Sequence, residues 1–152
     1  FKGVLDHPVT ALRDVSWAEW EAHQSKMEPL AAKRSAHPIG EDDRVIKGRK
    51  LLDSGDLAGF GKLMFASHDS SMNYFENSCV ELDTIVNAAR NTPGVLGARL
   101  SGGGFGGSVV ALIHPRDAET VSHAINVVFE KAYGHPCEIS VITPSVGARL
   151  IP

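Results

Sequence analysis

Five glycines within seven residues, in Ser101-Gly-Gly-Gly-Phe-Gly-Gly107, constrain this chain more than any other stretch of its sequence. A glycine inside a regular element costs about 0.5–1 kcal/mol relative to alanine, so the cluster requires a structural or chemical reason. Two apolar runs flank it, residues 95–100 and 108–113, and both are typical of β-strands. The glycines therefore either make a tight turn between strands or bring the backbone against a ligand, where N–H groups can bind an anion.

Two familiar glycine motifs are excluded by their surroundings. Gly102, Gly104 and Gly107 match G-x-G-x-x-G, but the dinucleotide-binding form of that motif opens a helix, whereas residues 108–113 read as a strand. Extension to Val109 also matches the glycine loop of protein kinases, yet no V-A-I-K, H-R-D or D-F-G motif follows. A strand-loop-strand phosphate nest, with the Ser101 hydroxyl at its mouth, and a purely structural hairpin both remain open from the pattern alone.

The N-terminal third of the sequence predicts two helices. Ser16-Trp-Ala-Glu19 has the form of a capping box, so we expect a helix over residues 17–30 that can continue to Lys33. Pro38 disfavours helix at the residue before it and predicts a break or kink there. A second helix is expected over residues 41–52, closed by the turn Asp53-Ser-Gly-Asp56.

Three further helices are predicted from caps and apolar periodicity. Asp56 can cap one of them, Ser78-Cys-Val-Glu81 reads as a capping box for the next, and Asp117 can cap the last, which ends before Gly134. Their expected apolar stripes are Leu57, Phe60, Met64 and Ser67; Leu82, Ile85, Val86 and Ala89; and Ala118, Val121, Ile125, Val128 and Ala132. Residues 68–77 can extend the first of these helices or leave it, and the pattern does not decide.

Two short segments near the C-terminus, residues 138–142 and 148–151, read as a third and a fourth strand. Helices followed by a β-β-α-β unit indicate an α+β fold class. We therefore expect a two-layer domain in which an antiparallel sheet of about four strands packs against helices.

Composition excludes several classes of function. The chain has 152 residues, enough for one domain with its own core, and a net charge of −3, which disfavours binding to nucleic acid. No apolar run is long enough to span a membrane and none reads as a signal peptide. Cys79 and Cys137 lack C-x-x-C partners, which favours a cytoplasmic location, and the seven histidines show no metal-binding spacing.

The string from Pro93 to Gly107, which contains the glycine cluster, resembles the third conserved motif of galactokinases, a family of the GHMP kinase superfamily. Upstream, Gly55-Asp-Leu-Ala-Gly-Phe-Gly-Lys-Leu-Met64, Ser67-His68 and Ser78-Cys-Val-Glu-Leu-Asp83 follow in the same order and spacing. Ala11-Leu-Arg-Asp14 and Pro144-Ser-Val-Gly-Ala-Arg149 also look like segments of that family.

The resemblance implies a ferredoxin-like C-terminal domain of a two-domain, ATP-dependent sugar kinase. The chain opens on Phe1 rather than methionine, and we expect residues 1–152 to be a fragment in which residues 1–12 lead in from the preceding domain. That N-terminal domain would carry the sugar motif, the nucleotide loop, the Mg²⁺ ligands and the catalytic aspartate, so no catalytic or metal-binding residue is expected here. The partners implied are ATP, a monosaccharide and the chain's own N-terminal domain, and the fragment alone is expected to be inactive.

By the same resemblance the glycine loop approaches the phosphates of ATP. The expected phosphate-binding residues are Ser101, Gly102, Gly103, Gly104, Phe105, Gly106 and Gly107. Of these, Ser101 to Gly104 would lie nearest the phosphates, Phe105 would contribute packing, and Gly106 and Gly107 would serve the path of the chain.

The resemblance implies phosphorylation of galactose at its anomeric hydroxyl, but the sequence departs from the family at a few positions. Met72-Asn-Tyr74 stands where an arginine followed by acidic residues is usual, and Val146 where an aspartate is common. A kinase for another monosaccharide or a uronic acid, and a non-catalytic α+β domain that binds a small ligand, therefore stay open as alternatives.

Overall fold

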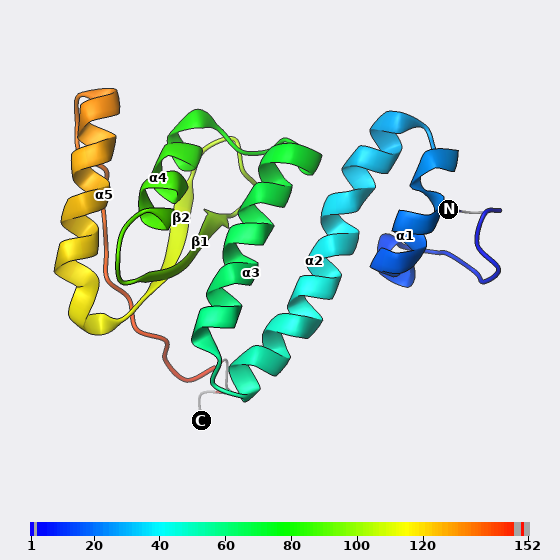
Figure 1. The fold of residues 1–152 in the computed structure, drawn as a ribbon, viewed down its shortest axis with the longest axis horizontal. Coiled ribbons are helices and arrows are strands. Elements are labelled where there is room, and N and C mark those ends of the chain that lie inside the picture. Colours follow the sequence, from blue (N-terminus) through cyan, green and yellow to red (C-terminus); the bar gives the residue numbers. More distant parts are fainter. Residues whose placement is uncertain (2, 148–149, 151–152) are drawn as a thin grey trace.

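The computed structural model describes residues 1, 3–147 and 150 of the chain, and its helices follow one another from one end of the molecule to the other (Figure 1). The helices are α1 (Trp17–His23), α2 (Pro29–Asp53), α3 (Leu57–Ser70), α4 (Val80–Arg90) and α5 (Ala118–Tyr133). The strands are β1 (Val95–Ser101) and β2 (Ser108–Ile113). A π-helical turn, Ser71–Phe75, continues α3, and short 3-10 turns lie at Leu12–Asp14, Gln24–Lys26 and Pro115–Asp117.

The two strands form an antiparallel hairpin whose connection is the glycine loop, residues 102–107. Leu100 pairs with Val109 and Ser101 with Ser108, so the loop leaves from the last pair of the ladder. A strand therefore follows the glycines, which confirms that they do not form a dinucleotide-binding turn. The helical and strand content confirms the α+β class.

The expected sheet of about four strands is wrong for the part of the chain that the structure describes, where the sheet has two strands. Residues 138–142 run as extended chain without strand pairing, and Ile142 is 79% exposed. The predicted strand at residues 148–151 lies outside the described residues apart from Leu150. Alternating apolar residues indicate that a segment can pair, but pairing also requires a neighbouring backbone edge, and a cleft separates 138–142 from β2.

The helix boundaries in the N-terminal third differ from the prediction. The capping box of Ser16 and Glu19 is confirmed, but α1 ends at His23 and α2 begins at Pro29. Proline at the first helical position is favourable because its missing N–H would have no partner there. The side chain of Glu28 caps the same end, accepting bonds from the N–H groups of Leu30 at 3.0 Å and Ala31 at 2.7 Å.

Pro38 does not break the helix as expected, because α2 runs through it to Asp53. An interior proline costs about 3 kcal/mol or more, and only tertiary packing can offset that amount. The helix lies between α1 and α3 (Figure 1). Ala36 and Ile39, on either side of Pro38 in sequence, are buried in one core with Trp20 and Val15. A second core, built from Val86, Ala88, Ala89, Ala98, Val121 and Ile125, joins α4 and α5 to β1.

Helix α3 lies so close to β1 that their backbones are in contact. A Cβ atom on Gly61 would stand 2.0 Å from the Leu96 carbonyl oxygen, and one on Gly97 would stand 2.3 Å from the Gly61 carbonyl oxygen. The buried face of α3 is therefore Gly61, Met64, Ser67, His68 and Ser70. The expected stripe was right for Met64 and Ser67 but wrong for Leu57, which is exposed.

We predict that Gly61→Ala destabilises the chain. Helix propensity alone would stabilise α3 by about 1 kcal/mol. The added methyl group would meet a backbone carbonyl that cannot move aside, and overpacking of this kind costs about 1–3 kcal/mol or more. Urea denaturation should show a net loss of unfolding free energy.

Gly48→Ala in α2 is the matched control for this substitution. Its new methyl group would lie 3.1 Å from the ring edge of Phe60, a side chain that can shift. The control should change stability much less than Gly61→Ala. A Gly61→Ala chain as stable as the wild type would show that α3 and β1 are not in backbone contact.

Candidate functional site

The glycine loop owes its composition to its backbone conformation. Gly102, Gly104, Gly106 and Gly107 have φ angles of +98°, +88°, +130° and +91°, in the region that side chains rarely adopt. Gly103 differs, because its φ lies outside that region and a Cβ atom on it would meet nothing within 4 Å. Four of the glycines are therefore explained by the path of the chain, and Gly103 is not.

The N–H groups of the loop glycines are free to bind a ligand. None of the five donates a hydrogen bond to another residue that the structure describes. Ser101, at the end of β1, is exposed beside them. A run of unpaired backbone donors with left-handed glycines is the arrangement that forms anion-binding nests. The loop can therefore accept a phosphate without rearranging any bond to the rest of the described chain.

Asn77 holds this loop in place, and sequence reasoning missed it. The N–H of Phe105 donates to the Asn77 carbonyl oxygen at 2.6 Å, and the Asn77 side-chain Nδ2 donates to the Gly103 carbonyl oxygen at 3.1 Å. A Cβ atom on Gly104 would stand 2.0 Å from the same Asn77 oxygen, so glycine is required there for space as well. The contact joins residues far apart in sequence, and no local pattern signals it.

Phe105 does not pack against the residues that the structure describes, and its expected packing role stays a prediction. Its side chain is 78% exposed, and its φ of +57° is left-handed, which is uncommon for a residue other than glycine. The bond from its N–H to Asn77 keeps the backbone in this conformation while the ring projects away from the core. An aromatic ring this exposed is available to contact a further domain.

His68 anchors the end of β1 as a structural hydrogen-bonding residue. The ring is 1% exposed, and the N–H of Leu100 donates to its Nδ1 at 3.2 Å. A neutral ring that accepts at Nδ1 carries its proton on Nε2, which lies 3.1 Å from Asp83 Oδ1. The same carboxyl oxygen accepts from the Ser78 hydroxyl at 2.5 Å.

Ser67 and Asp69, the sequence neighbours of His68, do not form a hydrolytic triad with it. The Ser67 hydroxyl donates to Glu41 at 2.9 Å, and Asp69 accepts from Arg90 at 2.6 Å, so both point away from the imidazole. The predicted capping box at Ser78 and Glu81 is wrong. Cys79 occupies the N-cap position without a side-chain bond, because the Ser78 hydroxyl is committed to Asp83.

A partly buried ion cluster supports β1 from the side of α2. The Glu41 carboxylate lies 2.5 Å from Arg44 Nε and 3.3 Å from Arg99 NH1, and Arg99 Nε donates to the Leu100 carbonyl oxygen at 3.1 Å. Burial raises the pKa of Glu41, but hydrogen bonds from Arg44 and Ser67 together with the positive charges of Arg44 and Arg99 outweigh it, so this pKa lies below its ordinary value. Leu100 is thus held at both its N–H and its carbonyl group.

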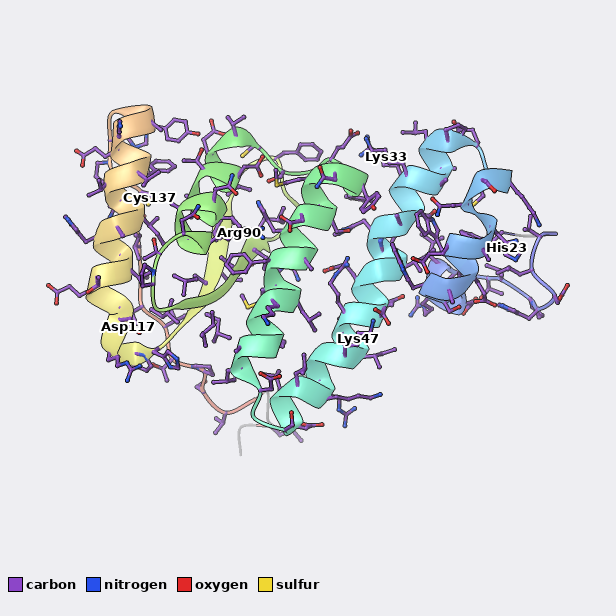
Figure 2. All side chains as sticks on the ribbon, viewed as in Figure 1. His23, Lys33, Lys47, Arg90, Asp117 and Cys137 are labelled. Carbon is purple, nitrogen blue, oxygen red and sulfur yellow. The ribbon has the colours of Figure 1, made fainter. Side chains whose placement is uncertain are left out.

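A cleft of about 980 Å³ lies beside the loop, between α4, β2, α5 and residues 137–142. Ser101 and residues 105–107 line one part of it, and Cys137 lies on another wall beside α5 (Figure 2), where its N–H donates to Asn126 Oδ1 at 2.8 Å.

Over residues 1, 3–147 and 150, no three His, Cys, Asp or Glu side chains are grouped so as to hold a metal ion. None of the helices in the same part of the chain is long and apolar enough to cross a membrane.

We predict that His68 makes stability fall as the pH drops below 7. Burial lowers the pKa of His68 below its ordinary 6.5, with Asp83 acting in the opposite direction. A lowered histidine pKa contributes stability that is present above pH 6.5 and is lost as the pH falls further, by up to about 1.4 kcal/mol per pH unit for one proton. Unfolding free energies measured from pH 7.5 to 5.5 should therefore decline less steeply in His68→Gln.

His7 provides a control of opposite sign for this pH dependence. Its pKa is raised, mainly by the hydrogen bond to Glu19, so its contribution is present at low pH and is lost as the pH rises through its folded pKa. His7→Gln should consequently make the decline toward pH 5.5 steeper. Identical slopes in the wild type and His68→Gln would contradict the assignment.

Comparisons with known proteins agree with this geometry. A galactokinase from Haemophilus influenzae is 41% identical over 147 residues, which cover 94% of this chain and 38% of the relative. One from Roseiflexus sp. is 38% identical over 140 residues, covering 91% of this chain and 36% of the relative. The chain therefore spans little more than a third of the length of the curated relatives that it matches.

A solved structure extends the agreement to the fold. The crystal structure of Lactococcus lactis galactokinase complexed with galactose matches 86% of this chain and 34% of that chain, with a TM-score of 0.81 and 33% identity. These findings confirm the resemblance to the C-terminal part of galactokinases. The family model described as GHMP kinases C terminal matches residues 49–131, more than half of the chain. The chain therefore belongs to the family of GHMP kinase C-terminal domains.

Proposed function

We propose that this chain is the C-terminal domain of an ATP-dependent sugar kinase, a galactokinase that transfers the γ-phosphoryl group of ATP to the anomeric hydroxyl of galactose. The observation that carries the proposal is the glycine loop, whose five N–H groups have no partner among the described residues although both ends of the loop are fixed. Galactokinase relatives that align over more than 90% of the chain support the same assignment.

Phosphoryl transfer asks a protein mainly to position the reactants and to stabilise charge on the transferring group. Backbone donors that are already oriented supply part of that stabilisation without reorganising during the reaction. In the proposal, Ser101, Gly102, Gly103 and Gly104 lie nearest the phosphates, and Gly106 and Gly107 shape the chain. The exposed ring of Phe105 faces the N-terminal domain.

The rest of the machinery belongs to that N-terminal domain. Mg²⁺ would neutralise phosphate charge when bound, and in the proposal its ligands and the catalytic aspartate belong to the preceding domain. Both cysteines are free, which agrees with a cytoplasmic enzyme that uses ATP. Galactose is the proposed sugar because the matched relatives are galactokinases.

We predict that Gly103→Val in the two-domain protein abolishes most kinase activity without unfolding it. This position has an ordinary φ, and a Cβ atom on it would meet nothing within 4 Å, so the described chain leaves room for a larger side chain. A side chain there would stand between the loop and a phosphate, and loss of one transition-state donor typically costs 10²–10³ in rate. kcat/KM for galactose-dependent ATP turnover should fall about a hundredfold or more, with an unchanged unfolding midpoint.

Ala58→Val is the control, because Ala58 is exposed in the first turn of α3 and far along the chain from the loop. It adds similar bulk and should leave kcat/KM within about twofold. Wild-type kinetics in Gly103→Val would rule out phosphate contact at this loop.

We also predict that the 152-residue chain alone shows no sugar-dependent ATP turnover, since the proposed catalytic aspartate is outside it. The two-domain protein should phosphorylate galactose in preference to other monosaccharides and to uronic acids in a coupled ADP-release assay. A preference for another sugar would correct the substrate while retaining the kinase. Absence of turnover with every sugar would favour the non-catalytic small-ligand domain.

A further inference from the structure

Two unusual backbone conformations meet at Asn77. Among the residues that the structure describes, Glu76 and Phe105 are the two non-glycine residues with positive φ, and both angles are +57°. Glu76 directly precedes Asn77, and Phe105 donates its N–H to the Asn77 carbonyl oxygen. Such conformations cost about 1–3 kcal/mol each and persist only where the surroundings hold them. The strain in the described backbone is thus concentrated at the support of the glycine loop.

Asn77 contacts the loop with both its backbone and its side chain. The carbonyl oxygen accepts from Phe105 at 2.6 Å, the side-chain amide donates to the Gly103 carbonyl oxygen at 3.1 Å, and the residue is only 6% exposed. The two bonds hold loop residues on either side of Gly104, which has no room for a side chain against Asn77. The position of Asn77 therefore sets the shape of the loop.

Charged residues near the N-terminal end of α2 fix the segment that leads into Asn77. The Arg34 guanidinium donates to the carbonyl oxygens of Tyr74 and Phe75 and to the Glu76 carboxylate. Lys33 Nζ lies 2.5 Å from the other oxygen of that carboxylate. Three consecutive residues of the turn that follows α3 are thus held by one planar group.

The bonds of Arg34 hold residues 74–76 through their number and direction more than through the charge of the guanidinium. An exposed ion pair contributes little to stability, and the side chains of Arg34 and Glu76 are both partly exposed. A guanidinium presents several donors in a rigid plane, so it can fix backbone carbonyls and a carboxylate together, whereas an ammonium group is a point charge. The bonds from Arg34 therefore fix the conformation of residues 74–76. A lysine at position 34 could not make the same set of bonds.

We propose that Asn77 is a positioning residue for the glycine loop and that Arg34 acts through it, by holding residues 74–76 in the conformation that presents Asn77 to Gly103 and Phe105. Neither residue is assigned contact with substrate. The structural part of the proposal stands on the contacts above, and its consequence for catalysis rests on the proposed kinase function.

The first test measures backbone amide exchange by NMR in this chain. Asn77→Ala removes the side-chain bond to Gly103 but keeps the backbone carbonyl that Phe105 uses, so loosening of the loop by one ordinary hydrogen bond should raise exchange at Phe105 about five- to tenfold. Arg34→Ala removes three bonds to residues 74–76 and should raise it at least as much, while the Leu100 amide bound to His68 keeps its wild-type rate in both variants. Lys47→Ala is the matched control, because its ion pair with Asp43 lies on the other half of α2 from Lys33 (Figure 2). This control should leave amide exchange at Phe105 at the wild-type rate.

Arg34→Lys separates positioning from ordinary stabilisation. The substitution keeps the positive charge beside Glu76, so a role limited to stability would be rescued and exchange at Phe105 would return to the wild-type rate. Positioning predicts that the thermal midpoint is retained and the faster exchange persists. Should Asn77→Ala fail to fold, this variant decides the question on its own. Wild-type exchange at Phe105 in both Arg34 variants would overturn the proposal.

The second test uses the two-domain protein and steady-state kinetics. Asn77→Ala should lower kcat about tenfold while KM for galactose stays within twofold, because a misplaced loop affects charge stabilisation rather than sugar binding. A wild type without any kinase activity would refute the proposed function and leave the exchange result standing. Faster exchange together with an unchanged kcat would show that the loop position does not matter for the reaction.

Discussion

The contact between the backbones of α3 and β1 is the constraint on which the rest of the domain depends. Gly61 and Gly97 leave no room for a β-carbon on either side, so the helix lies directly on the strand. His68 follows Gly61 by two helical turns and therefore emerges on the same face, where its Nδ1 accepts from the N–H of Leu100. A helix held further from the sheet could not make this bond, and the last residues of β1 would lose their anchor.

The glycine loop is rich in the most conformationally permissive residue, yet other residues of the chain hold it in place. Leu100 is held at its N–H by His68 and at its carbonyl group by Arg99, and Asn77 holds Gly103 and Phe105. The bonds that fix the loop use its carbonyl groups and the N–H of Phe105, which leaves the glycine N–H groups for a ligand. Donors that are fixed before a ligand arrives need no reorganisation, which is the physical basis of electrostatic preorganisation.

Local signals in the sequence were sufficient where the interacting groups are neighbours along the chain. The capping bonds of Ser16 with Glu19 and of Asp56 with Gly59 formed as predicted, and so did the hairpin around the glycines. The prediction failed at Pro38, where packing of α2 between α1 and α3 offsets the local penalty, and at Ser78, where Asp83 captures the hydroxyl. The third strand failed because a cleft separates residues 138–142 from β2.

The sequence by itself determined that residues 102–107 form a glycine loop between two strands, and its motifs indicated the kinase family, because turn chemistry and motif spacing are local properties. Only the tertiary structure decided what holds that loop. Asn77 contacts it directly, Arg34 holds the residues that precede Asn77, and His68 holds Leu100 at the end of β1. All three come from distant parts of the chain, and nothing in the local sequence around Asn77 or Arg34 signals these contacts. The contacts exist because Gly61 and Gly97 let α3 approach β1, an arrangement that depends on all of the packed elements together.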